Sequence, residues 1–216
     1  MFLGHYAVAL ALKKAAPKTS LGVLVLAAQF IDFLWPLFLL LGLEHVRIDP
    51  GNTVFTPLDF YDYPFSHSLL AVLAWASGFG AIYFLLRRNV RSAIILGACV
   101  LSHWLLDALT HRPDLPLGPS GTTRVGFGLW NHLAATIVFE GALFAIGIFW
   151  YARATMAVDR IGRVAFWGLM ILLGGIWCAN IFSPPPPNST AVALAGLSLW
   201  LTAAWAHWFD QHRKVR

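Results

Sequence analysis

Apolar runs of about 20 residues recur along the whole sequence, and this repetition constrains the fold more than any other feature. An α-helix of about 20 apolar residues is long enough to cross the hydrocarbon core of a bilayer. Of the 216 residues, 58% are hydrophobic and 12% are charged, whereas a soluble domain carries about 25% charged residues. The sequence therefore predicts an all-α, polytopic membrane helix bundle with about six spans. The expected spans are residues 20–43, 66–86, 91–111, 131–151, 164–182 and 189–208.

A shorter apolar segment, residues 2–16, precedes the first span and carries lysines at its end. It is too short to cross a bilayer, so we expect a half-length helix with Met1 buried partway up the membrane. The net charge of +5 does not indicate nucleic-acid binding, because the basic residues lie at the ends of the spans. The positive-inside rule then places both termini on the cytoplasmic side of the membrane, with only Arg47, Arg112 and Arg124 outside.

The predicted bundle has two parts. Residues 1–155 form a helical membrane domain that carries the candidate metal ligands, and residues 156–216 supply two supporting transmembrane helices whose interiors hold no ionisable group. Cys99 and Cys178 lie inside apolar runs and imply no disulfide framework. Membrane lipids are the expected surroundings and partners of such a chain.

Three ionisable residues, His103, Asp107 and His111, lie four residues apart inside an otherwise apolar run. On an α-helix, residues four apart differ by about 40° and form one stripe. A charged group inside the membrane costs about 2.5–3.5 kcal/mol even on a lenient scale. Such a stripe is typical of a metal site, a proton path or a buried polar network, and we interpret it as a metal site.

Other ionisable residues fall at a similar expected depth on different spans. They are His5, Asp32, His67, His132 and Glu140. Together with the stripe they exceed the four ligands of one zinc ion, so either more than one metal binds or some groups are outer partners and general bases. Imidazoles with carboxylates favour zinc, with manganese or iron as alternatives. A proton or ion pathway and a purely structural network remain the other interpretations.

The chemistry-bearing motifs have a definite order. They are Gly4-His5, Asp32, Ser66-His67-Ser68-Leu69-Leu70 and His103-x-x-x-Asp107. This order resembles the membrane-bound metal-dependent hydrolases described as LexA-binding, inner-membrane-associated hydrolases, over about residues 1–145. That family is distantly similar to the zinc-dependent phospholipase C superfamily, whose members are helical enzymes with a multi-metal site.

The resemblance implies that Asp32, His67, His103 and Asp107 surround one metal ion, with His5 as the amino-terminal ligand.

By the same resemblance, a second metal would be held by His111 and Glu140. The superfamily pattern has a His where this chain has Thr136, so the resemblance leaves one or two zinc ions open. His132 lies one helical turn from that position.

The expected activity is hydrolysis of a phosphoester or related ester, in which zinc activates a water molecule. Asp32 or Glu140 would act as the general base, and the outer-loop residues Arg112 and Arg124 would bind a phosphate group. A site open to the outer side of the membrane favours a lipid or lipid-linked substrate.

Two functions from other classes use the same residues. A proton- or ion-coupled transporter would use the cluster as a relay, and a non-catalytic scaffold would keep the metal only for folding. In the outer loop 44–65, Thr56 and Pro57 resemble the start of a helix. That loop is expected to hold either a short interfacial helix or an aromatic belt.

Overall fold

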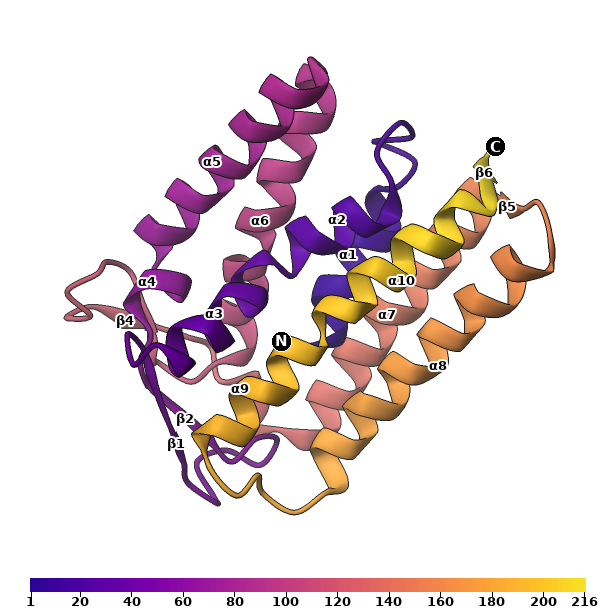
Figure 1. The fold of residues 1–216 in the computed structure, drawn as a ribbon. Coiled ribbons are helices and arrows are strands. Elements are labelled where there is room, and N and C mark those ends of the chain that lie inside the picture. Colours follow the sequence, from indigo (N-terminus) through magenta and orange to yellow (C-terminus); the bar gives the residue numbers. More distant parts are fainter.

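The computed structural model describes residues 1–216 and confirms an all-α, polytopic helix bundle (Figure 1). Five helical segments are long and apolar enough to cross a membrane, and a sixth span exists if one bent helix pair is counted. Each matches a predicted span. The straight spans are α5 (Leu69–Arg87), α6 (Val90–Thr110), α7 (Leu133–Ala154), α8 (Arg160–Phe182) and the α9 (Ser189–Ser198) and α10 (Trp200–Gln211) pair.

The bent span consists of α2 (Leu21–Ala28) and α3 (Phe30–Leu40), which meet at an angle of 56°. The break lies at Gln29, whose backbone leaves the helical region at φ −98° and ψ 5°. Pro36 lies inside α3 without breaking it. The carbonyl of Ala28, the last residue of α2, accepts a hydrogen bond in the site described below.

The amino-terminal helix α1 (Leu3–Leu12) is short and buried, and Met1 is buried with it. It packs along α7, where Gly147 permits a close approach. A Cβ atom at Gly147 would lie 2.7 Å from the Cα of Ala7. Small residues at helix contacts are the usual way in which membrane helices approach closely. This packing holds the start of α1 deep in the bundle.

At one end of the bundle, the loops form two small antiparallel sheets. Strand β1 (His45–Ile48) pairs with β2 (Leu58–Asp62), and β3 (Leu115–Pro116) pairs with β4 (Arg124–Val125). The short helix α4 (Pro64–His67) follows β2, and the 3₁₀ turn η1 (Leu129–Asn131) precedes α7.

The interfacial helix considered for loop 44–65 is wrong. The backbone N–H of Asp49 donates to the carbonyl of Pro57 at 2.7 Å, which extends the β1–β2 pairing past Ile48. The aromatic residues after Pro57 favour a strand.

The opposite end carries most of the basic residues, the α5–α6 turn and a third sheet, β5 (Thr155–Ala157) with β6 (Arg213–Val215) (Figure 1). A buried ion pair joins helices there. The Nζ atom of Lys13 lies 2.6 Å from Asp210 Oδ2, and that carboxylate also accepts from the N–H of Leu21 and the hydroxyl of Tyr151. Residues from α2, α7 and α10 and the end of α1 are thereby tied together.

The carboxy-terminal part packs on the rest of the bundle. α9 lies against α3, and α10 lies against α2 and α8. The α5–α6 hairpin lies on one side of Figure 1, and α7 with α8 lies on the other.

Candidate metal centre

Four side chains from three elements bring potential ligand atoms together. They are Asp32 of α3, His67 of α4, and His103 and Asp107 of α6. Asp32 Oδ1 lies 3.6 Å from His67 Nε2 and 3.5 Å from His103 Nε2. Asp107 Oδ2 lies 3.8 Å and 3.2 Å from the same two nitrogens. Ligands at about 2.0–2.1 Å from a tetrahedral zinc ion are about 3.3–3.4 Å apart, so these separations fit a bound ion.

The imidazole of His103 is oriented for binding a cation. Its Nδ1 atom lies 2.9 Å from the carbonyl oxygen of Ala28, the last residue of α2. Because a carbonyl only accepts, Nδ1 donates, and the neutral imidazole then carries its lone pair on Nε2. That Nε2 atom is buried and faces the carboxylates of Asp107, at 3.2 Å, and Asp32, at 3.5 Å. A ligand histidine that donates its other N–H to a carbonyl is the usual arrangement at metal sites.

His67 is oriented by the carboxylate of Glu44, which acts through the hydroxyl of Ser66. Its Nδ1 lies 2.7 Å from the hydroxyl oxygen of Ser66, which in turn lies 2.6 Å from Glu44 Oε2. A carboxylate accepts from the Ser66 hydroxyl, so that hydroxyl accepts from His67 Nδ1 and leaves Nε2 as the free atom. Glu44 also accepts the backbone N–H groups of Phe65 and Ser66, both at 2.7 Å.

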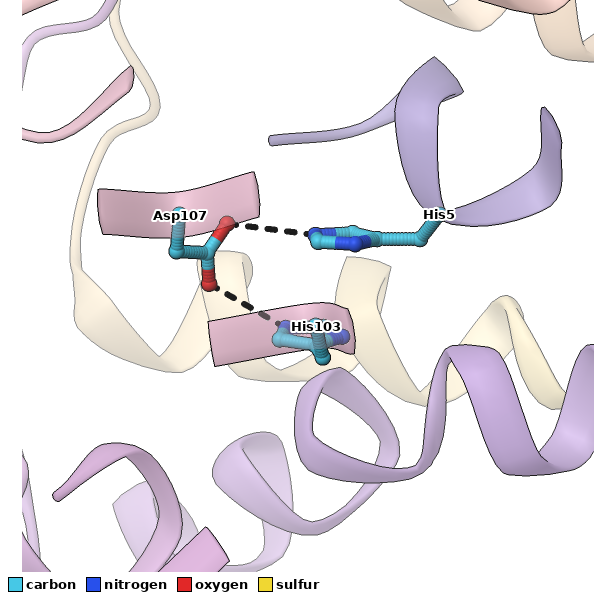
Figure 2. Close-up of side chains that lie close together, drawn as sticks. All are labelled: His5, His103 and Asp107. Carbon is cyan, nitrogen blue, oxygen red and sulfur yellow. Dashed lines mark hydrogen bonds and ion pairs between the residues drawn. The ribbon is translucent and has the colours of Figure 1, made fainter. Parts of the chain in front are cut away.

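A second buried group of potential ligands overlaps the first and consists of His5, His103 and Asp107 (Figure 2). His5 Nε2 lies 3.2 Å from Asp107 Oδ1. The His5 and His103 rings are stacked, with centroids 3.6 Å apart and planes at 7°. The amino group of Met1 also contacts Asp107 Oδ1. The two oxygens of Asp107 therefore serve different neighbours, and His5 Nδ1 is buried without a partner.

The site is closed on most sides. The side chains of His67, His103 and Asp107 are at most 4% exposed, whereas that of Asp32 is 27% exposed. Asp32 therefore marks the open face. The indole of Trp35 lies edge-on to the ring of His67 and covers a neighbouring side.

Glu140 lies outside both ligand groups. Its Oε2 atom accepts the N–H groups of Phe2 and Leu3 at 3.1 Å and 3.0 Å, at the start of α1. An anion is favourable at this positive end of a helix. The structure therefore places Glu140 as a partner of α1, and His5 is held in place partly through it.

The predicted stripe on α6 ends before its last member. The helix stops at Thr110, and His111 follows in an extended conformation. Its Nδ1 lies 2.9 Å from Asp114 Oδ1, and its ring packs on Trp130. His111 is thus not brought to either ligand group. His132 is exposed at the start of α7 and is likewise apart from them.

The arginines expected to bind a phosphate make hydrogen bonds and ion pairs within the loops at the β1–β4 end of the bundle. Arg112 pairs with Asp59, and its Nε lies 3.3 Å from Asp114 Oδ2. Arg124 donates to the carbonyl of Tyr61 at 2.7 Å and to that of Gly121 at 3.1 Å. Both residues hold loops together beside the site.

Tyr63, just outside the spans, connects these loops to the centre. Its ring centroid lies 5.0 Å from that of His67, and its hydroxyl donates to Asp114 at 3.0 Å. Burial raises the pKa of the Tyr63 hydroxyl well above its ordinary range, and the nearby Asp114 carboxylate raises it further. Tyr63 therefore stays protonated.

Sequence reasoning selected the four central residues and His5, but it missed Glu44 and the role of Ser66. The adjacency of Ser66 to His67 was the available signal.

Comparison of the chain with protein-family models, with curated proteins and with solved structures finds no match.

Proposed function

We propose that this chain is an integral membrane, metal-dependent hydrolase in which Asp32, His67, His103 and Asp107 bind one divalent ion. The supporting observation is that Asp32 and Asp107 each hold a carboxylate oxygen within 3.8 Å of the Nε2 atoms of His67 and His103, in a site where His103 is buried. Two imidazoles with two carboxylates favour zinc among the common ions. His5 lies beside this group as a further ligand or as a partner of Asp107.

The proposed reaction is hydrolysis of a phosphoester or related ester. A divalent ion at this place would supply a Lewis acid and activate water near neutral pH. Asp32 is the partly exposed member of the group, and its Oδ1 faces the two histidines. Its other oxygen is left to accept a proton at the open face. His103 and Asp107 are buried and orient the site from the opposite side.

The substrate class follows from the position of the site. The four residues lie among helices that are long and apolar enough to cross a membrane, so a lipid or lipid-linked ester reaches the open face most directly. The outer side of the membrane is the expected side of attack, because the positive-inside rule places the loop that precedes α4 outside.

The first test is the metal content of the detergent-solubilised protein, measured by elemental mass spectrometry. We expect about one zinc ion per chain from the four-ligand set, and loss of that ion in His103→Ala and in Asp32→Asn. His132→Ala is the matched control, because His132 is exposed and outside the ligand groups. Hydrolysis of phospholipids and isoprenoid phosphates is then assayed with the same samples. Equal zinc in wild type and His103→Ala would contradict the proposed site.

A second function, ion-coupled transport, is favoured by the break in the first span. Discontinuous helices that end beside ionisable residues are typical of transporter binding sites, and the break at Gln29 lies one turn before Asp32. Uptake of zinc or protons into vesicles that contain the purified chain separates the two functions. Flux that needs Asp32, together with no hydrolysis, would favour the transporter.

A further inference from the structure

A polar cavity of about 310 Å³ lies at the basic end of the bundle, far from the candidate metal centre. Its lining residues come from the start of α2, the end of α5, the start of α6 and the later part of α10. Lys18, Arg87 and His207 line it together with hydroxyl and amide side chains. No acidic residue is among the lining residues.

The two permanent cations at this cavity are free to bind an anion. The side chains of Lys18 and Arg87 are exposed, and the lysine and arginine ion pairs of the structure are made by Lys13, Arg47 and Arg112. Their positive charges are therefore not neutralised by the protein.

Two helices also start at the cavity. Ser20 accepts the N–H of Val23 at the start of α2, and Asn89 accepts the N–H of Ser92 at the start of α6. The amino-terminal end of a helix carries a partial positive charge. His207 completes the wall with its Nδ1 3.0 Å from the Ser20 hydroxyl oxygen. The helix ends therefore add to the attraction that Lys18 and Arg87 exert on an anion.

An apolar groove of about 630 Å³ runs along the α5–α6 hairpin. Phe84 and Val90 line the groove, and their chain neighbours Tyr83 and Asn89 line the polar cavity. A cation-lined cavity beside a long apolar groove matches a molecule with an anionic head and an acyl chain. Basic pockets between helices at the cytoplasmic face of a membrane are suited to anionic headgroups.

We propose that this cavity binds the phosphate group of an anionic phospholipid, with an acyl chain along the α5–α6 groove. The site is separate from the proposed hydrolytic centre and does not depend on its activity. A free phosphate ion shares the headgroup chemistry but has no acyl chain to bind in the groove.

The test measures binding of phosphatidylglycerol to the full, detergent-solubilised chain by native mass spectrometry and by thermal shift. Phosphatidylcholine and inorganic phosphate are the comparison ligands. We expect phosphatidylglycerol to bind more tightly than either. The double variant Lys18→Gln and Arg87→Gln should bind it roughly thirtyfold more weakly, from about fivefold for each basic residue lost. The single variant Arg87→Lys, which keeps the positive charge, should retain most of the wild-type affinity.

The matched control removes two other cations from the same end of the bundle. Arg160→Gln with Arg163→Gln changes the net charge equally, and both residues are exposed and outside the cavity. It should bind phosphatidylglycerol within about twofold of wild type, since the loss is expected only where charge lines the site. An equal loss in both double variants would show that general surface charge attracts the lipid, and this would overturn the site. Equal affinity for inorganic phosphate and for phosphatidylglycerol would overturn the lipid assignment.

Discussion

At the scale of single residues, the proposed centre depends on which imidazole nitrogen carries the proton. The carbonyl of Ala28 fixes the proton on Nδ1 of His103, and the Glu44–Ser66 pair fixes the proton on Nδ1 of His67. In both cases the Nε2 lone pair faces the carboxylates of Asp32 and Asp107. Such outer partners commonly change metal affinity by about 10–100-fold.

Replacing Ser66 by alanine should therefore weaken zinc binding by about 10–100-fold while the four ligands remain. The substitution leaves His67 Nδ1 without its partner, so its ring orientation and tautomer are no longer set. Competition with a fluorescent zinc chelator measures the affinity. Ser77→Ala is the control, because Ser77 is exposed and bonds only to the carbonyl of Leu73 on its own helix. Unchanged affinity in Ser66→Ala would remove Ser66 and Glu44 from the site.

The protonation of Tyr63 makes a prediction for alkaline pH. Its pKa is raised above the ordinary value of 10.0 by burial and by Asp114. As the pH rises through about 10, the phenol ionises in the unfolded chain but not in the folded one, so folding stability falls. The protonated Tyr63 therefore leaves folding stability unchanged below about pH 10, and stability decreases progressively as the pH rises above that value. Absorbance titration should show fewer tyrosines ionising near pH 10 than in the denatured protein, and Tyr63 should account for one tyrosine of that shortfall. The shortfall should shrink in Tyr63→Phe, whereas the exposed Tyr61→Phe should leave it unchanged.

The sequence singled out the residues that lie together at the proposed centre, because an ionisable group inside an apolar run needs a polar partner. The grouping of Asp32, His67, His103 and Asp107 came from the family resemblance, because expected depth alone left eight candidate residues. His111 could not be placed, because spacing assumes that the helix continues, and α6 ends at Thr110. The Pro at position 113 disfavours helix in the residue before it.

At the scale of elements, the position of α1 relative to α7 decides where His5 lies. A Cβ atom on Gly147 would lie 2.7 Å from the Cα and 2.8 Å from the carbonyl oxygen of Ala7, which is backbone and cannot rotate away. His5 is on the same short helix, half a turn earlier. The sequence predicted both helices but not this contact, because a glycine in a membrane helix does not by itself indicate close packing. Gly141 on the same helix has nothing within 4 Å of an added Cβ atom.

Gly147→Ala should therefore destabilise the protein by about 1–3 kcal/mol, the usual cost of overpacking a close contact. It should also weaken zinc binding if His5 supports Asp107. Gly141→Ala is the matched control on the same helix, since nothing lies within 4 Å of its added Cβ. Thermal unfolding in detergent and zinc titration measure the two effects. Equal stability of the two variants would show that α1 shifts without cost.

Irregular segments were the part of the fold that the sequence described least well. The β1–β2 hairpin stands where an interfacial helix was one of two alternatives, because backbone pairing between the segments around Asp49 and Pro57 outweighs the local helix-start signal at Thr56. The expected spans needed no such long-range information, because burying about 20 residues in lipid requires every backbone group to be satisfied within the helix.

At the scale of the whole molecule, a metal bound at the proposed centre would be coupled to folding. The proposed ligands come from α3, α4 and α6, so a bound ion joins elements that are far apart in the sequence. An ion that binds the folded state alone stabilises it by about 2.7 kcal/mol at a hundred times its dissociation constant. Without the ion, two carboxylates and two imidazoles remain close together in a site with little access to water.

Zinc should therefore raise the unfolding temperature of the chelator-treated protein, and the rise should grow with the logarithm of free zinc. The effect should vanish in His103→Ala and persist in His132→Ala, which keeps the ligand set intact. The same titration separates catalysis from a scaffold role. If hydrolysis follows zinc occupancy, and Asp32→Glu keeps the zinc-dependent stability but loses turnover, the ion serves the reaction as well as the fold. If zinc restores stability and no ester is cleaved by any sample, the centre is structural. No change in stability with zinc would contradict the proposed metal centre.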